Sequence, residues 1–278
     1  MRGNGTFWGL SRTFLPFALS VSAMWVAPWR AAATPEKAVS LAESSAAGVP
    51  AAALAGYATG EATPGGTGRY YFGREIAHFM SHQGIGWLER DSRESEERTS
   101  ALIDALELEP GMCVADVGAG SGRLTLPMAR RVAPGIAYGT DIQPEMLAFL
   151  EARARTEGLS NLKGILGDTQ DVHLPESGVD LVLLVDAYHE FEFPWEMTRS
   201  IARALKPGGR VALVEFRAED PDVPIKALHK MTEAQARREL EAAGLRWVST
   251  DARLPWQHLV FLGVHEPGAD GGDGPDIP

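Results

Sequence analysis

The stretch VADVGAGSGRLTLPMARR, residues 114 to 131, decides the fold. It begins with an apolar run, continues through glycines at positions 118, 120 and 122, and ends with the apolar spacing of a helix. Such a loop leaves backbone N–H groups free and lets a ligand approach the main chain. Tight turns also need glycine, so the loop alone is weak support for a ligand. The dinucleotide fingerprint G-x-G-x-x-G requires a glycine at position 123, which is Arg123 here.

Strand and helix patterns alternate along the chain around this stretch. Predicted strands are Met112–Val117, Ile136–Asp141, Leu162–Leu166, Val179–Val185, Arg210–Phe216, Leu245–Thr250 and His258–Val264. Predicted helices between them are Ser121–Val132, Pro144–Glu157, Pro194–Leu205 and Thr232–Ala243. This alternation predicts a parallel sheet with helices on both faces, and the two successive strands at the end permit an antiparallel edge.

The glycine pattern G-x-G-x-G, preceded by Asp116, resembles the first motif of class I S-adenosylmethionine-dependent methyltransferases. The resemblance continues in YGTDIQPEML, where Asp141 ends the second strand, in ILGDTQ, where Asp168 follows the third, and in LKPGGRVALVEF, residues 205 to 216. It implies an α/β fold with a Rossmann-like, seven-stranded, mostly parallel sheet, helices on both faces and an N-terminal helical cap. It also implies an enzyme, a methyltransferase that uses S-adenosylmethionine and yields S-adenosylhomocysteine.

The same resemblance assigns the cofactor-binding residues. Asp141 stands where an acidic side chain accepts both ribose hydroxyls, and Asp168 stands where the family places an acidic residue on the adenine amino group. Each aspartate has an alternative role as the cap of the segment that follows it. The expected cofactor-binding residues are Asp116, Gly118, Gly120, Gly122, Asp141, Ile142, Asp168, Thr169 and Asp186.

The stretch LVDAYHEFEFP, residues 184 to 194, joins the fourth strand to a polar loop. Ligands of an open parallel sheet lie outside the carboxyl ends of its strands, and in this family the fourth strand lies beside the first. We therefore expect the loop to face the transferable methyl group. His189 is the candidate general base, and Tyr188 and Glu190 are candidates to orient the acceptor or tune the histidine. The alternative is that His189 only hydrogen-bonds a loop and Tyr188 only packs.

Two further segments are expected to complete the pocket. Glu215 and Arg217 lie at the carboxyl end of the fifth strand, where the alternative is a surface ion pair. The segment PIKALHKMT offers Lys226, His229 and Lys230, which suit an anionic acceptor if they face inward and otherwise form a solvated loop.

Residues 69–110 show helical spacing, so two or three helices are predicted to form a cap before the first strand. Tyr70, Tyr71 and Trp87 are candidates for the aromatic wall of this cap. His78 and His82 have an i, i+4 spacing that can share a metal ion, but no third ligand accompanies them, so no metal site is expected.

The net charge narrows the class of acceptor, and the cysteine content bears only on disulfide bonds. A net charge of −11 argues against a surface that follows phosphate backbones or anionic lipids. We therefore expect a small-molecule acceptor and no nucleic-acid partner. The alternatives are a protein or peptide acceptor, and a protein that binds S-adenosylmethionine without catalysis. Cys113 is the single cysteine, which excludes an intrachain disulfide.

The two ends of the chain differ from the domain between them. Residues 1–33 combine arginines, an apolar stretch and Ala31-Ala32-Ala33, which predicts a signal peptide or anchor and therefore export, unless the start is misassigned. Residues 34–68 are typical of a flexible linker, and residues 267–278 of a disordered acidic tail. The methyltransferase domain is expected over residues 111–266.

Overall fold

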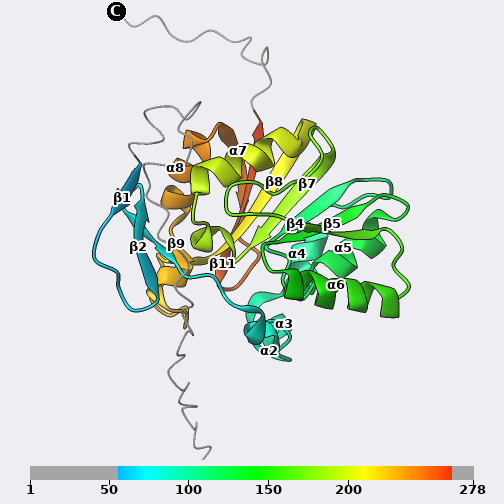
Figure 1. The fold of residues 1–278 in the computed structure, drawn as a ribbon, viewed down its shortest axis with the longest axis horizontal. Helices are drawn as coiled ribbons and strands as arrows, with labels where there is room; N and C mark the ends of the chain where they lie inside the picture. Colours follow the sequence, from blue (N-terminus) through cyan, green and yellow to red (C-terminus); the bar gives the residue numbers. More distant parts are fainter. Residues whose placement is uncertain (1–55, 265–278) are drawn as a thin grey trace, which may run out of the picture. The chain divides into compact units, whose positions relative to one another are not determined.

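The computed structural model describes residues 56–264, which contain one large, mostly parallel sheet (Figure 1). Its strand order is β10-β11-β8-β7-β4-β5-β6, and β9 pairs with β8 off this path. Only β11 runs antiparallel to its neighbours, β8 and β10. The strands are β4 (Val114–Val117), β5 (Ala137–Asp141), β6 (Leu162–Leu166), β7 (Val179–Val185), β8 (Leu205–Arg217), β9 (Lys230–Met231), β10 (Leu245–Asp251) and β11 (Gln257–Val264).

Helices cover both faces of this sheet, because successive side chains of each buried strand point to opposite faces. In β7, Val182 and Leu184 pack in the core beneath α7 and α8, whereas Leu181 and Leu183 pack in the core that includes α4 and α5. The predicted α/β fold with helices on both faces is confirmed. The helices are α4 (Thr99–Ala105), α5 (Thr125–Val132), α6 (Pro144–Thr156), α7 (Pro194–Ala204) and α8 (Glu233–Ala242).

The order of the strands places the glycine loop beside the fourth strand of the sequence-based prediction. β4 pairs in parallel with β5 on one side and with β7 on the other. Chain connections therefore leave in opposite directions at β4 and β7, and the loops after these strands meet at the carboxyl edge of the sheet.

Residues 57–77 form a separate antiparallel sheet, so the predictions of a linker to residue 68 and of helix from residue 69 are wrong. Its strands, in the order β1-β2-β3, are β1 (Tyr57–Thr59), β2 (Gly66–Tyr71) and β3 (Arg74–Ala77). Phe72 and Gly73 both have positive φ, 46° and 86°. A two-residue turn of that kind folds a chain back into a hairpin, and Ile76 reaches a buried position from β3.

Short helices follow this hairpin, within the residues of the predicted cap. They are η1 (His82–Gly84), α2 (Ile85–Leu88) and α3 (Arg93–Glu97), and α4 comes next. His78 follows the end of β3 and His82 begins η1, so no helix carries both imidazoles on one face.

A buried ion pair between Arg74 and Glu239 connects β3 with α8. The Arg74 guanidinium donates to both carboxylate oxygens of Glu239 at 2.8 Å and to the backbone carbonyl of His189 at 3.0 Å. Glu239 is fully buried. The N-terminal hairpin is therefore bound to the same loop that carries the candidate base.

The predicted signal peptide, the first part of the predicted linker and the predicted acidic tail lie outside the described residues. Among residues 56–264, no helix has the length and apolar character needed to cross a membrane.

Candidate functional site

The glycine loop after β4 turns the chain sharply and exposes Gly118, whereas Gly120 and Gly122 are buried. Gly118, Gly120 and Gly122 all have positive φ, between 52° and 79°, which side chains rarely tolerate. The N–H groups of Gly118 and Ala119 both donate to the Thr140 carbonyl, which ties the loop to β5. A Cβ atom on Gly118 would lie 2.8 Å from the Cβ of Ala187, so the loop also approaches the end of β7. The loop delays the helix, and α5 begins at Thr125 instead of Ser121.

Asp141 stands at the end of β5 and contacts the glycine loop directly. One carboxylate oxygen accepts the Gly120 N–H at 3.0 Å, and the other accepts the Gln143 N–H at 2.9 Å. Burial raises the pKa of Asp141, and the backbone donors partly offset that rise. Each oxygen retains a lone pair, so two hydroxyl groups can still donate to this carboxylate. Ile142, next to it, presents an apolar side chain that is 37% exposed.

Asp168 and Thr169 lie in a turn after β6. Asp168 accepts the backbone N–H groups of Gln170 and Asp171 at 2.7 and 2.8 Å, and its other oxygen lies 3.3 Å from a ring nitrogen of His173. This is the capping arrangement that the sequence offered as the alternative. A contact from Asp168 or Thr169 to adenine stays a prediction.

Two buried carboxyl groups flank the glycine loop on the side of β7. Asp116 accepts the Thr125 hydroxyl at 2.6 Å, and burial raises its pKa to about 6. Asp186 has a φ of 50° and accepts from Gln257 at 2.8 Å, but its second oxygen is buried without a partner. A buried acceptor without a donor is costly, so a positively charged N–H donor such as the ammonium of S-adenosylmethionine fits this position.

The pKa of Asp116 predicts a stability change that depends on pH. The native carboxyl titrates near 6 and the unfolded one near 3.8, so the native state binds more protons between these values and stability falls as pH rises through that window. The Asp116→Asn substitution keeps an acceptor for Thr125 and removes the charge. We expect it to raise the free energy of unfolding by about 3 kcal/mol at pH 7.5 and to change it little at pH 4.

Urea unfolding at pH 4, 5, 6 and 7.5 measures this change. Asp104→Asn is the matched control, because Asp104 is largely exposed in its ion pair with Arg131 and should show no such trend. An equal gain for Asp116→Asn at every pH would contradict the assignment.

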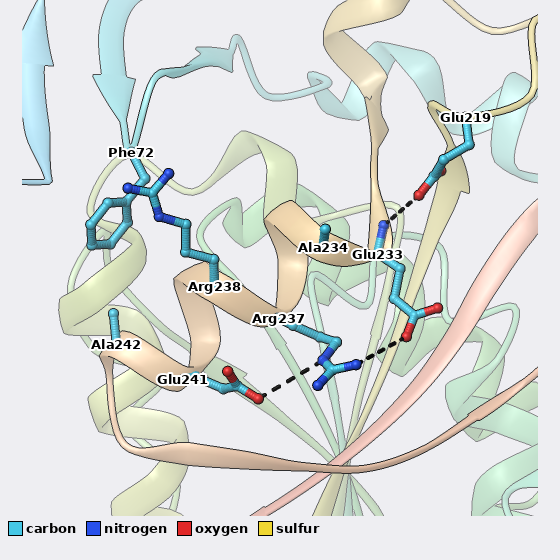
Figure 2. A pocket seen from close by; sticks show the side chains of 8 residues that line it. All are labelled: Phe72, Glu219, Glu233, Ala234, Arg237, Arg238, Glu241 and Ala242. Carbon is cyan, nitrogen blue, oxygen red and sulfur yellow. Dashed lines mark hydrogen bonds and ion pairs between the residues drawn. The ribbon is translucent and has the colours of Figure 1, made fainter.

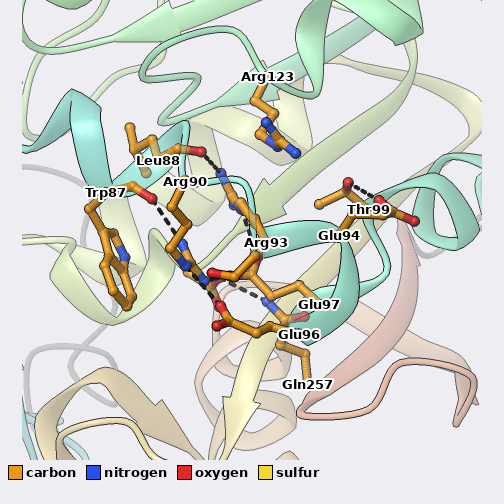
Figure 3. A network of polar contacts seen from close by, with 12 residues as sticks. Trp87, Leu88, Arg90, Arg93, Glu94, Glu96, Glu97, Thr99, Arg123 and Gln257 are labelled. Carbon is orange, nitrogen blue, oxygen red and sulfur yellow. Dashed lines mark hydrogen bonds and ion pairs between the residues drawn. The ribbon is translucent and has the colours of Figure 1, made fainter. Parts of the chain in front are cut away.

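The segment containing α2 and α3 contacts the glycine loop, and its role as a cap over the cofactor stays a prediction. A Cβ atom on Gly120 would lie 2.8 Å from Leu88, and Glu89 accepts from the Ser121 hydroxyl at 2.5 Å. Arg93 donates to Glu97 at 2.7 Å and to the Leu88 carbonyl at 3.1 Å, which holds the two short helices together (Figure 3). The cavity left beside the loop, about 40 Å³, is lined by Leu88, Arg93, Asp116, Gly118, Ala119, Ser121, Arg123, Leu124 and Val185.

The predicted aromatic wall of the cap is wrong for its two tyrosines, and for Trp87 it stays a prediction. Tyr71 is buried against Tyr57 and Phe72 in the small sheet. Tyr70 donates to the Glu61 carbonyl. Trp87 is 52% exposed beneath the Arg90 guanidinium. The two tyrosines lie in β2 of the hairpin, whereas the tryptophan lies in α2. A single continuous helix, as predicted, would have kept all three in one element.

His189 is the centre of a buried polar cluster at the carboxyl end of β7. It lies in η2 (Tyr188–Glu190), and its Nδ1 lies 2.7 Å from a carboxylate oxygen of Glu215 in β8. The other oxygen of Glu215 accepts the His189 backbone N–H at 3.2 Å. On the opposite side of the ring, Nε2 lies 2.9 Å from Nδ1 of His229 in η3 (Ala227–His229). A carboxylate of Glu190 comes within 3.8 Å of His189 Nε2 and 3.9 Å of His229 Nδ1.

Burial and mutual charge set the protonation of this cluster. Burial lowers the pKa of His189, but the Glu215 carboxylate outweighs it, so the net shift is upward. Burial raises the pKa of Glu190 to about 7. Burial and the neighbouring charge of His189 lower the pKa of His229 to about 4, so His229 is neutral at physiological pH. The cluster can therefore hold one proton between two rings.

The remaining predicted acceptor residues divide between this cluster and other positions. Tyr188 is buried and its ring packs against Phe191, which favours the packing alternative. Arg217 donates to backbone carbonyls of the β10–β11 connection, and Lys230 donates to the Asp220 carbonyl. Lys226 is exposed.

Two residues that the sequence did not suggest connect the cofactor loop with the cluster. The Met80 N–H donates to Glu190 at 3.3 Å, and the Met80 carbonyl accepts from the Gln143 side chain at 3.0 Å. Gln143 lies two residues after Asp141, so its place near the cofactor could have been predicted from the sequence. Met80 contributes only its backbone N–H and carbonyl, so its residue type gives no sequence signal for this role.

A larger hollow, about 700 Å³, lies along α8 and away from the glycine loop (Figure 2). Arg237 lies between Glu233 and Glu241, and the Glu233 N–H donates to Glu219. These side chains neutralise one another on an open helix surface, so the hollow offers no catalytic group.

Comparisons with known proteins agree on the type of domain. A family profile described as a methyltransferase domain matches residues 115–213, from β4 to β8. The tRNA (adenine(58)-N(1))-methyltransferase TrmI of Thermus thermophilus is 29% identical over 215 residues, which cover 73% of this chain and 78% of that protein. Nocamycin O-methyltransferase of Saccharothrix syringae is 34% identical over 113 residues, 40% of each protein.

Two further similarities bear on the fold and on the range of relatives. The ubiquinone/menaquinone biosynthesis C-methyltransferase UbiE of Idiomarina loihiensis is 31% identical over 116 residues, 41% of this chain and 46% of that protein. The crystal structure of a SAM dependent methyltransferase from Aquifex aeolicus superposes with a TM-score of 0.62 at 23% identity, over 66% of this chain and 98% of that one.

Proposed function

We propose, from the premise that this chain is a class I S-adenosylmethionine-dependent methyltransferase, that it methylates a small molecule held beside His189, Glu190 and His229. One observation carries the proposal. The cluster stands at the carboxyl end of β7, beside the β4 glycine loop, where the methyl group of a bound cofactor is expected.

The cofactor supplies a methyl group on a sulfonium, which is already activated for in-line displacement. The glycine loop and Asp141 are proposed to hold the adenosine part, with Ile142 against the base, and Asp186 is proposed to accept from the ammonium group. The chain then has to align the acceptor, exclude water and take up a proton if the acceptor carries one. The cluster of His189, Glu190 and His229 has the titratable groups for that proton.

Charge favours a small acceptor over a nucleic acid. A protein that follows phosphate groups needs unpaired arginines or lysines along its contact face. Near the carboxyl edge of the sheet, each of these arginines has a carboxylate partner: Arg74, Arg90, Arg93, Arg123 and Arg153. The relative named for tRNA keeps a nucleic-acid acceptor as the competing case, whereas the other two relatives are named for small molecules.

A transfer assay with methyl-labelled S-adenosylmethionine tests the proposal. The purified chain is incubated separately with a fractionated metabolite extract, with tRNA and with denatured protein, and calorimetry with S-adenosylhomocysteine runs in parallel. We expect label in the low-mass fraction. Label in tRNA or protein would overturn the acceptor class, and no binding of S-adenosylhomocysteine would overturn the cofactor site.

The His189→Gln substitution tests the role of the cluster once an acceptor is found. We expect kcat to fall by about 100-fold or more, the range for a lost acid–base group, with S-adenosylhomocysteine affinity unchanged. His258→Gln is the matched control, because His258 also pairs with a carboxylate, Glu219 at 2.8 Å, outside the cluster. A His189→Gln enzyme with an unaltered rate across pH would remove His189 from the reaction.

A further inference from the structure

Three potential ligand atoms converge at the cluster. His189 Nε2 and His229 Nδ1 are 2.9 Å apart, and an oxygen of Glu190 lies 3.8 and 3.9 Å from them. The centre of this triangle lies about 2.1 Å from all three atoms, which is the bond length of Zn²⁺ to imidazole nitrogen and carboxylate oxygen. The three side chains form a His-Glu-His group whose potential ligand atoms all lie within 4.8 Å of one another.

Two of the three side chains, His189 and Glu190, are also oriented by a second contact. Glu215, itself 1% exposed, accepts from His189 Nδ1, so the lone pair of the ring lies on Nε2. A carboxylate behind a ligating histidine is the usual support of a metal site. One oxygen of Glu190 accepts the Met80 N–H, which leaves the other directed at the two rings.

A plain hydrogen bond between the two rings is the competing arrangement. It accounts for the 2.9 Å separation of the ring nitrogens. It leaves the Glu190 oxygen at 3.8 Å from the nearest ring nitrogen, which is too long for a hydrogen bond. A single ion at the centre would contact all three atoms.

We propose that His189, Glu190 and His229 bind a divalent transition-metal ion of the zinc type. Two imidazoles and one carboxylate select Zn²⁺ or Co²⁺ over Mg²⁺ and Ca²⁺, which prefer oxygen ligands. The sequence-based expectation of no metal site considered His78 and His82, whereas these ligands come from two loops forty residues apart in the chain.

Three protein ligands leave a coordination position open for a fourth group. An acceptor oxygen, nitrogen or sulfur at that position loses its proton to solvent more readily, because the ion lowers its pKa. Its lone pair then forms the bond to the methyl carbon while the bond from carbon to sulfur breaks, and neutral S-adenosylhomocysteine leaves. This catalytic role rests on the proposed function and would replace proton uptake by the two rings, because the ion occupies their free nitrogens. The binding of the ion does not rest on the proposed function.

Metal titration of the full chain tests the site. The protein is dialysed against a chelator and then titrated calorimetrically with Zn²⁺, Co²⁺ and Mg²⁺, with the visible spectrum recorded for Co²⁺. We expect one equivalent of Zn²⁺ or Co²⁺ to bind, an absorption band of a four- or five-coordinate cobalt site, and no heat with Mg²⁺. A protein that binds neither Zn²⁺ nor Co²⁺ would overturn the inference.

Variants locate the site. His229→Gln is expected to weaken Zn²⁺ binding at least a hundredfold, and Glu215→Gln by 10- to 100-fold, the range for a lost supporting carboxylate. His258→Gln is the matched control and should retain wild-type affinity. Glu190→Gln, the most conservative change, keeps the inference testable if a histidine variant fails to fold. Equal Zn²⁺ affinity in His229→Gln, Glu190→Gln and wild type would place the ion elsewhere.

Calorimetry with S-adenosylhomocysteine separates this inference from the proposed function. If S-adenosylhomocysteine binds and Zn²⁺ does not, the metal site is wrong and the transferase proposal stands. If Zn²⁺ binds and S-adenosylhomocysteine does not, the cofactor site is wrong and the metal site stands.

Discussion

The Asp141→Ala substitution is expected to weaken S-adenosylhomocysteine binding by at least about a hundredfold. Asp141 holds the Gly120 N–H of the glycine loop and has lone pairs left for two hydroxyl groups. A hydrogen bond to a charged group contributes roughly 1.5–3 kcal/mol, and the loss of two corresponds to about two orders of magnitude or more in affinity. Isothermal titration calorimetry measures this loss.

Asp180→Ala is the matched control for this experiment. Asp180 also accepts a backbone N–H, from Cys113 at 2.7 Å, but it is the second residue of β7 and lies at the opposite, amino-terminal edge of the sheet. Its variant should bind S-adenosylhomocysteine normally. Thermal unfolding of Asp141→Ala shows whether the loop, and not only the ligand, has lost support. Unchanged affinity in a folded Asp141→Ala protein would show that the ribose assignment is wrong.

The Arg74→Leu substitution is expected to destabilise the fold by about 3–5 kcal/mol. It would leave the fully buried carboxylate of Glu239 without its cation, and this is the cost of breaking a buried ion pair from one side. The His189 carbonyl would lose its donor as well. Urea unfolding measures the change.

Two variants separate this effect from simple loss of an arginine. The double variant Arg74→Leu with Glu239→Leu should recover most of the stability, because it leaves no unpaired charge. Arg69→Leu, in the neighbouring strand, should cost less than about 1 kcal/mol, since the Arg69–Glu192 pair is partly exposed. Equal losses in Arg69→Leu and Arg74→Leu would contradict the role given to Glu239.

The sheet was predictable because its signals are local. The apolar run of β7 ends where the polar loop begins, and the bounds Val179–Val185 are those predicted. The glycines after β4 likewise predict a turn from residue type alone. Strand order followed from the resemblance, and the pairing of β4 with β7 confirmed it.

The N-terminal hairpin was not predictable by apolar spacing. Ile76, Phe79 and Met80 repeat at helical intervals, yet Ile76 lies in β3 and the other two follow it. The deciding feature is the turn at Phe72 and Gly73, and a single glycine in an aromatic segment gives little sign of a hairpin.

The composition of the cluster was only partly predictable. Its first members, His189 and Glu190, are adjacent in the sequence and follow a predicted strand. The contact of His189 with His229 depends on the path of the chain after β8, which no local pattern encodes. Glu215 was visible as a strand end, but its buried contact with His189 requires the parallel pairing of β7 with β8.

The two hydrogen bonds of Met80 make one peptide segment common to both halves of the site. Its N–H donates to Glu190, in the cluster proposed to hold the acceptor, and its carbonyl accepts from Gln143, beside the residues proposed to hold the adenosine part. A ligand that moves this segment on one side changes the free energy of binding on the other, and by thermodynamic reciprocity the two affinities change by the same factor. A ligand beside Glu190 and a ligand beside Gln143 would then share this backbone segment at Met80.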